Sequence, residues 1–467
     1  MLECEVFSSR ADDWKKFSDQ QRADLLRSEL WTIYGHGADG LLLWGFSRDD
    51  SFSLTDGEFN ARVLACRDTS HLMRMLGLAK LRRTPAQVAL LLDPDAYLRT
   101  GALDGGSLSG GSALDGECHG LHAAVLAAGI PCDVVMAAQL ATAVTRYRAL
   151  ILPASPLMDQ ATADRLTAFV SAGGTLITVA PFAIANRWGE PSLTVPACGL
   201  NELFPINLAG VLPALGGIPT IAFAEHGAGR SAAIAGAVGN AYLGGGAPGL
   251  PQVLAGILAR GQVLPALRLT CAGAVPPDAA LLASTGAGGN RLLVVAAQGD
   301  RAGATRTATS VAVEIPGAMP HAVFVCPPTA ISDGVVRSGP RSLPATPVAG
   351  GCRLELGTVT SALPVLLCGT STPLLGLEMP ARVKVGSPVS VVVTCYNPSA
   401  AAMAVSVELR ATGATAAATA VRIPAYGQAA VPLTFTPTAA TPRLCVTAVL
   451  RSGASETVAV PVDLAVE

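Results

Sequence analysis

The sequence predicts a chain of mixed class, in which an α/β part is followed by an all-β part. Short apolar runs alternate with amphipathic helical stretches from residue 85 to about residue 261. Beyond that point the helical period disappears, and short strands continue between Gly and Pro turns. A length of 467 residues is enough for three or four domains, each with a core of its own.

The N-terminal part is predicted to contain two helices and one or two short strands. A helix is expected over 18–35, because Ser18 is a good N-cap and apolar residues then recur at helical spacing. The apolar run 40–44 is typical of a parallel strand buried on both faces. A second helix is expected over 63–76, and residues 1–7 form a further candidate strand.

Residues 85–262 are predicted to form a flavodoxin-like doubly wound domain. Alternating strands and helices of this kind place parallel strands in one sheet, with helices on both faces. The four central strands expected in this domain are 87–93, 132–136, 147–153 and 175–179.

The all-β part is predicted to form two β-sandwich domains, over 263–370 and 371–467. A Ser-Thr-Pro-Leu segment starting at Ser371 is interpreted as the linker that opens the second sandwich. Seven candidate strands follow it, which is the number typical of an immunoglobulin-like domain.

Composition excludes several classes of function. Lys and Arg number 32 against 34 Asp and Glu, so the chain lacks the basic excess of a nucleic-acid-binding protein. No run of about 18 apolar residues is free of Gly, Pro and charge, so no membrane span is expected. The 11 cysteines are spread without close pairs, and the first residues are acidic where a signal peptide is basic. Reduced core thiols and a cytoplasmic setting are therefore predicted.

Several motifs resemble the glycoside hydrolase family 42 β-galactosidases. Residues 27–44, with a His-Gly-Ala turn after the helix, are similar to the last helix–strand unit of that family's catalytic barrel. The doubly wound segment is similar to the family's trimerisation domain, which is glutamine-amidotransferase-like. Its matching motifs are Val88–Asp95, Gly129–Val134, Tyr147–Pro153 and Ala172–Leu176. The resemblance thus implies the remnant of a (β/α)8 barrel over 1–84, followed by a trimerisation domain and C-terminal β domains.

The resemblance also implies where catalytic residues would lie. In the family a nucleophilic glutamate follows barrel strand seven, and residues 1–7 match that strand. Glu5 is therefore the position expected for the nucleophile, and Glu3 is the less favoured one. Glu5 is preferred because it lies nearer the C-terminal end of the strand, where barrel chemistry takes place. A solvated acidic N-terminus is the alternative interpretation of both glutamates.

A second carboxyl group is needed for catalysis. Retaining glycosidases use two carboxyl groups about 5–5.5 Å apart, and the family's acid/base glutamate follows strand four. A complete barrel takes about 250 residues, so the strand-four position lies outside a segment that ends at residue 84. Trp44, at the end of the candidate eighth strand, could stack on a sugar ring, and a core or interface role is equally open.

One further motif is not interpreted as catalytic. Gly116-Glu-Cys-His-Gly120 fits the G-x-C-x-G elbow of a cysteine nucleophile, but such an elbow directly follows a strand and this one does not. Cys118 is therefore interpreted as a residue near a helix start with no catalytic role. Cys118 and His122 could supply two metal ligands, whereas a structural zinc needs four. No metal site and no cofactor are predicted.

Two functions remain open. The first is a non-catalytic structural or assembly subunit related to the β-galactosidases, forming a homo- or hetero-oligomer. The second is the C-terminal part of a split or processed retaining β-galactosidase that another chain completes. Two leftover parallel strands cannot bury both faces, so we expect a partner chain or the chain's own doubly wound domain to cover the barrel remnant. The absent acid/base residue favours the first function.

Overall fold

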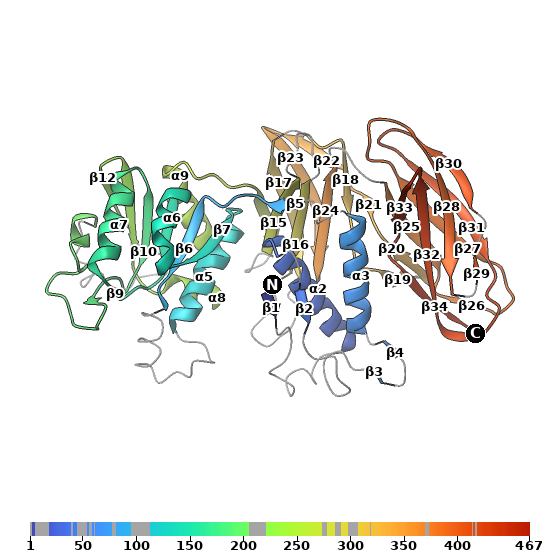
Figure 1. Cartoon of the computed structure of the whole chain (residues 1–467), viewed down its shortest axis with the longest axis horizontal. Helices are drawn as coiled ribbons and strands as arrows, with labels where there is room; N and C mark the ends of the chain where they lie inside the picture. Colours follow the sequence, from blue (N-terminus) through green and yellow to red (C-terminus); the bar gives the residue numbers. More distant parts are fainter. Residues whose placement is uncertain are drawn as a thin grey trace. The chain divides into compact units, whose positions relative to one another are not determined.

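The computed structural model shows a mixed α/β protein with many strands in several sheets, as predicted (Figure 1). It describes residues 2–4, 18–38, 41–43, 54–55, 58–59, 61–76, 81–94, 113–204, 221–272, 278–284, 291–297, 307–317, 319–368, 373–412, 414–415 and 418–467. The chain divides into two compact units. The first contains residues 1–83 and 270–467, and the second contains residues 84–269.

The second unit is built on a six-stranded sheet of order β12-β13-β10-β8-β6-β7. Its strands are β6 Val88–Leu92, β7 Cys132–Met136, β8 Ala149–Leu152, β10 Thr175–Val179, β12 Ile221–His226 and β13 Gly229–Ile234. All neighbours pair in parallel except β12, which is antiparallel to β13. The four predicted central strands are confirmed. They are short apolar runs because both faces are covered, and every residue of β8 and β10 is buried.

Helices cover both faces of this sheet. They are α5 Ala113–Ala127, α6 Leu140–Arg146, α7 Gln160–Ser171, α8 Val238–Leu243 and α9 Leu250–Arg260, with 3-10 turns η2 Ala137–Gln139 and η3 Leu200–Glu202. Leu166 of α7 lies in one buried cluster, and Leu121 of α5 with Leu254 of α9 lies in the other. Strand β13 ends at Ile234, and Val238 begins α8.

Two short strands of the second unit form a separate two-stranded sheet, which we call the β9–β11 excursion. Strands β9 Leu157–Met158 and β11 Ala185–Asn186 pair in parallel there. This excursion carries several exposed apolar side chains, which are described below.

The N-terminal residues belong to the first unit. Helix α2 Asp19–Gly35 begins where the sequence predicts, because Ser18 forms a capping box with Gln21. Helix α3 Ala61–Met75 follows, and the short strands are β1 Leu2–Cys4, β2 Leu41–Leu43, β3 Leu54–Thr55, β4 Glu58–Phe59 and β5 Leu81–Arg83. Trp31 and Leu72 share a buried cluster with Leu292 of the β part. The two helices therefore cover a sheet of the β part.

Two sheets form the first part of the β region. One has the order β21-β18-β24-β16-β15-β5 and the other β14-β17-β23-β22. Their strands are β14 Arg268–Ala272, β15 Asp278–Ser284, β16 Arg291–Ala296, β17 Ala308–Pro316, β18 Ala322–Val325, β21 Arg341–Ser342, β22 Ala345–Val348, β23 Gly351–Val359 and β24 Ala362–Cys368. Strand β5, from the N-terminal part, closes the first sheet by pairing with β15.

Two further sheets form the C-terminal sandwich. Their orders are β19-β20-β25-β27-β31 and β26-β34-β32-β28-β29, with β30 on β28 and β33 on β32. The strands are β19 Ala330–Ser332, β20 Val335–Ser338, β25 Leu374–Pro380, β26 Arg382–Val383, β27 Val389–Tyr396, β28 Met403–Ala411, β29 Ala414–Thr415, β30 Thr419–Ile423, β31 Gln428–Phe435, β32 Thr441–Ser452, β33 Ser455–Val458 and β34 Val462–Val466. Strand β20 pairs with β25, so this sheet contains strands from both sides of residue 370.

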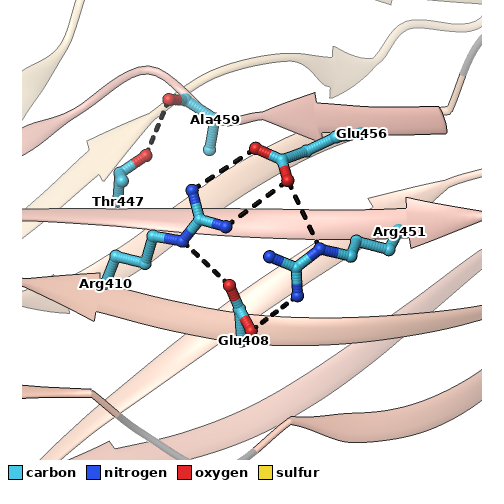
Figure 2. Close-up of polar contacts among 6 residues, drawn as sticks. All are labelled: Glu408, Arg410, Thr447, Arg451, Glu456 and Ala459. Carbon is cyan, nitrogen blue, oxygen red and sulfur yellow. Dashed lines mark hydrogen bonds and ion pairs between the residues drawn. The ribbon is translucent and has the colours of Figure 1, made fainter. Parts of the chain in front are cut away.

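A cluster of four charges links three strands of this last sheet (Figure 2). Residues 405, 407 and 409 of β28 point into the core, so Glu408 and Arg410 face outward. Glu408 accepts hydrogen bonds from Arg410 Nε at 2.8 Å and from Arg451 Nη1 at 2.9 Å. Glu456 on β33 contacts both arginines. The hydrogen bond from Arg451 lowers the pKa of Glu408.

Candidate functional site

The predicted catalytic positions lie at the N-terminus, where the structure describes little. Glu5 and Trp44 lie outside the described residues, and only the backbone of Glu3 is described. Strand β1 pairs in parallel with β2, and Glu3 is opposite Leu42 in this pair. The two candidate barrel strands are therefore neighbours, and the roles of the three residues stay predictions.

The Cys118 motif is part of a helix and packs against another helix. Gly116 and Gly120 are one turn apart on α5, on the side that α8 approaches. A Cβ atom at Gly120 would overlap the carbonyl oxygen of Gly239, and one at Gly116 would overlap the side chain of Asn240. The two glycines allow this close approach. Packing therefore explains the G-x-C-x-G pattern, and Cys118 lies within the helix as expected.

A buried carboxylate fixes the same contact. Glu117 is only 1% exposed, and its two oxygens accept hydrogen bonds from the backbone N–H groups of Gly239 at 2.9 Å and Asn240 at 3.0 Å. These N–H groups begin α8, where a helix has no internal partner for them. Burial raises the pKa of Glu117, although the hydrogen bonds oppose the shift. Sequence reasoning missed this residue, because its partners lie more than a hundred positions away.

The metal hypothesis gains no support. Among the residues that the structure describes, no group of three His, Cys, Asp or Glu side chains could hold a metal ion. Cys118 is buried, and His122 Nε2 lies 3.4 Å from the carbonyl oxygen of Cys132.

A cavity of about 510 Å³ lies at the C-terminal ends of β6, β7 and β8. Strand residues and prolines form most of its wall, and six polar or sulfur-bearing side chains lie among them. The lining residues are Leu90, Leu91, Leu92, Asp93, Pro94, Cys118, His119, His122, Val134, Met136, Pro153, Ala154 and Ser155. Sequence reasoning did not identify it, although the C-terminal ends of central parallel strands were the signal that pointed there.

A second feature is an apolar surface on the excursion around β11. Trp188 is 65% exposed and Leu193 fully exposed, and Ile184 is also open to solvent. Asn186 holds the turn between them: its Oδ1 accepts the N–H groups of Trp188 at 2.9 Å and Glu190 at 3.0 Å. Its Nδ2 donates to the Glu190 carboxylate at 2.7 Å. The exposed side chains are therefore presented by a hydrogen-bonded turn, and we call residues 184–193 the apolar turn.

Residues 86–208 match a family profile described as the beta-galactosidase trimerisation domain. The resemblance predicted for the doubly wound segment is thereby confirmed. The matched segment includes the cavity and the apolar turn. No curated protein sequence matches the chain. In the part of the chain that the structure describes, no helix is long and apolar enough to cross a membrane.

Solved structures of glycosidases are similar over about three quarters of the chain. A beta-galactosidase from Bacillus circulans sp. alkalophilus is 15% identical over 74% of this chain and 52% of its own, with a TM-score of 0.48. A catalytic mutant of a GH42 beta-galactosidase from G. stearothermophilus is 14% identical over 74% and 51%, with a TM-score of 0.49. An alpha-L-fucosidase from Paenibacillus thiaminolyticus is 14% identical over 75% and 58%, with a TM-score of 0.44. The chain spans about half the length of the two galactosidases.

Proposed function

We propose that this chain, which carries a β-galactosidase trimerisation domain, is a non-catalytic assembly subunit whose copies associate through that domain. The observation that carries the proposal is the apolar turn, which lies inside the matched segment 86–208. We also propose a cytoplasmic setting, because the 11 cysteines are spread along the sequence without close pairs.

Physical chemistry supports association through the apolar turn. Fully burying one large apolar side chain stabilises by about 1.5–3 kcal/mol. Burial of Trp188 and Leu193 in an interface would therefore contribute favourable free energy to association. Tryptophan is also enriched among residues that dominate interface energies. Because the Asn186 hydrogen bonds already order the turn, less conformational entropy is lost when it binds. A second copy of the chain is the partner that the trimerisation match favours.

The finer fold assignments belong to the same proposal. The parallel order β7-β6-β8-β10-β13 supports a flavodoxin-like domain. The parallel β1–β2 pair supports a barrel remnant. In that remnant Glu5 is the proposed position of a nucleophile relic and Glu3 the less favoured one, with Trp44 as the proposed sugar-stacking residue.

Light scattering during size-exclusion chromatography tests the assembly proposal. The chain has a mass of 47.3 kDa, and the proposal predicts a larger multiple of this mass at micromolar concentration. A mass of one chain at every concentration would contradict it.

The alternative function is the C-terminal part of a split or processed retaining β-galactosidase, which the adjacent β1 and β2 strands favour. In that case a second chain carrying an Asn-Glu strand-four motif copurifies, and turnover of a chromogenic β-galactoside appears only in the mixture. Glu5→Gln should then abolish the restored turnover while Glu3→Gln retains it. The assembly proposal instead predicts that the purified chain has no turnover and that no such partner copurifies.

A further inference from the structure

We propose that the cavity at the ends of β6, β7 and β8 binds a neutral, planar nitrogen heterocycle of about nucleoside size. This inference concerns ligand binding and is independent of the assembly proposal.

The position of the cavity is the first argument. From β6 the chain crosses through α5 to β7 on one side and returns through α6 to β8 on the other side. Residues of α5 and α6 lie in the two clusters on opposite faces of the sheet. Strand β6 is therefore the point where the winding direction reverses, and ligands of open α/β sheets bind in the crevice at this point. A volume of about 510 Å³ lies within the usual range for small-molecule sites.

The apolar wall is the second argument. Cys132, Val134 and Met136 alternate along β7 and share one face of the sheet. Cys132 is buried in the cluster beneath α5, whereas Val134 is 47% and Met136 44% exposed. Both of these side chains line the cavity. A flat ring lying against them would remove this apolar surface from water.

The polar lining indicates the charge of the ligand. Asp93, His119, His122 and Ser155 line the cavity, and the Ser155 hydroxyl donates to the carbonyl oxygen of Pro153 at 3.0 Å. Imidazole and hydroxyl groups can hydrogen-bond the edge of a heterocycle. Among the lining residues that the structure describes there is no Lys or Arg, the side chains that neutralise phosphate groups. A neutral ring is therefore favoured over a nucleotide.

A sugar fits this lining less well than a heterocycle does. Hydroxyl groups surround a pyranose ring, and those placed against the Leu, Val, Met and Pro walls would lose their hydrogen bonds. A planar heterocycle has apolar faces and keeps its polar atoms at its edge. That distribution matches walls that are mostly apolar and carry a few polar side chains.

Saturation-transfer NMR and calorimetry on the full chain test the proposal, with adenosine, guanosine, cytidine, uridine and riboflavin as probes. At least one should bind saturably, and its 5′-phosphate should bind at least tenfold more weakly. Met136→Asp should weaken binding of that probe at least tenfold, and His119→Ala, at an exposed position, at least threefold. Val392→Asp, on an exposed position of β27, should leave it unchanged.

Three results would overturn the proposal. They are no binding of any of the five probes, binding of galactose or of a nucleotide at least as tight as that of the best neutral probe, and unchanged affinity in both cavity variants. Thermal melting of each variant shows whether it is folded, and His119→Ala keeps the test valid if Met136→Asp does not fold.

Discussion

At the scale of single residues, Glu117 is the clearest structural determinant of the second unit. Its carboxylate accepts hydrogen bonds from two backbone N–H groups in the first turn of α8, where a helix in general offers no internal acceptor. Its neighbours Gly116 and Gly120 let α8 come close enough for these bonds. The G-x-C-x-G pattern was visible in the sequence, but its purpose was not, because α8 is short and lies far along the chain.

Glu117→Ala should destabilise the second unit by about 1–3 kcal/mol, the typical cost of leaving buried donors unsatisfied. Glu117→Gln should cost less, because its amide oxygen still accepts one N–H group. Urea unfolding monitored by circular dichroism measures both values. Glu202→Ala, at an exposed position in η3, is the matched control and should change stability little. Equal stabilities of Glu117→Ala and the control would refute the capping role.

The raised pKa of Glu117 makes a pH-dependent prediction. A carboxyl whose pKa is raised on folding binds more protons in the folded state, so its contribution favours folding below the ordinary value of 4.5. That contribution is lost as pH rises from 4.5 through the raised folded-state pKa. Wild-type stability should therefore fall relative to Glu117→Gln across this window. A difference between the two proteins that is constant with pH would contradict the shift.

At the scale of elements, strong local signals were predictable and long-range pairings were not. Helix α2 begins at the predicted cap because Ser18 and Gln21 lie within one turn. In contrast, Leu374 ends the segment interpreted as a linker, yet it is buried as the first residue of β25. Leu374 pairs with Tyr396 of β27, and β20, which comes from before residue 370, pairs with the later part of β25. A short segment carries no periodicity that reveals such a distant partner.

The α5–α8 contact gives the element-scale prediction. Gly120→Ala places a Cβ atom against the Gly239 carbonyl oxygen, and overpacking of this kind costs about 1–3 kcal/mol. Gly256→Ala is the matched control, because Gly256 lies in α9 with no atom near its Cβ position. This control should instead stabilise by about 0.5–1 kcal/mol through helix propensity. Thermal unfolding of both variants distinguishes these effects, and a stabilised Gly120→Ala would contradict the close packing.

At the scale of the whole molecule, the N-terminal residues are part of a larger unit. Arg67 of α3 forms ion pairs with Asp68 at 2.7 Å and with Asp463 of β34 at 2.8 Å. Ser361 donates to the backbone oxygen of Asp24 in α2 at 2.9 Å. The sequence predicted α2 and α3, but not that the β part packs against them. Such contacts join residues hundreds of positions apart, and no local pattern encodes them.

Of the candidate site, the domain that carries it could be predicted from the sequence, but the exposed residues could not. The resemblance located the trimerisation domain from a few strand motifs, and the family match confirms it over residues 86–208. The apolar turn was not predicted, because Trp and Leu are residue types usually found in a core. Only the fold shows that Trp188 and Leu193 are exposed. The exposure of these two side chains depends on the path of the chain around β9 and β11, which the sequence pattern does not reveal.

The most direct test of the account compares association of the wild type with a variant of the apolar turn. Trp188→Ser combined with Leu193→Asp changes two exposed side chains, so the fold should be retained. Leu264→Asp combined with Ile331→Ser changes two exposed apolar residues elsewhere and is the matched control. Sedimentation velocity should show an oligomer for the wild type and the control, and a 47.3 kDa monomer for the turn variant. A turn variant that associates as tightly as the control would contradict the central claim.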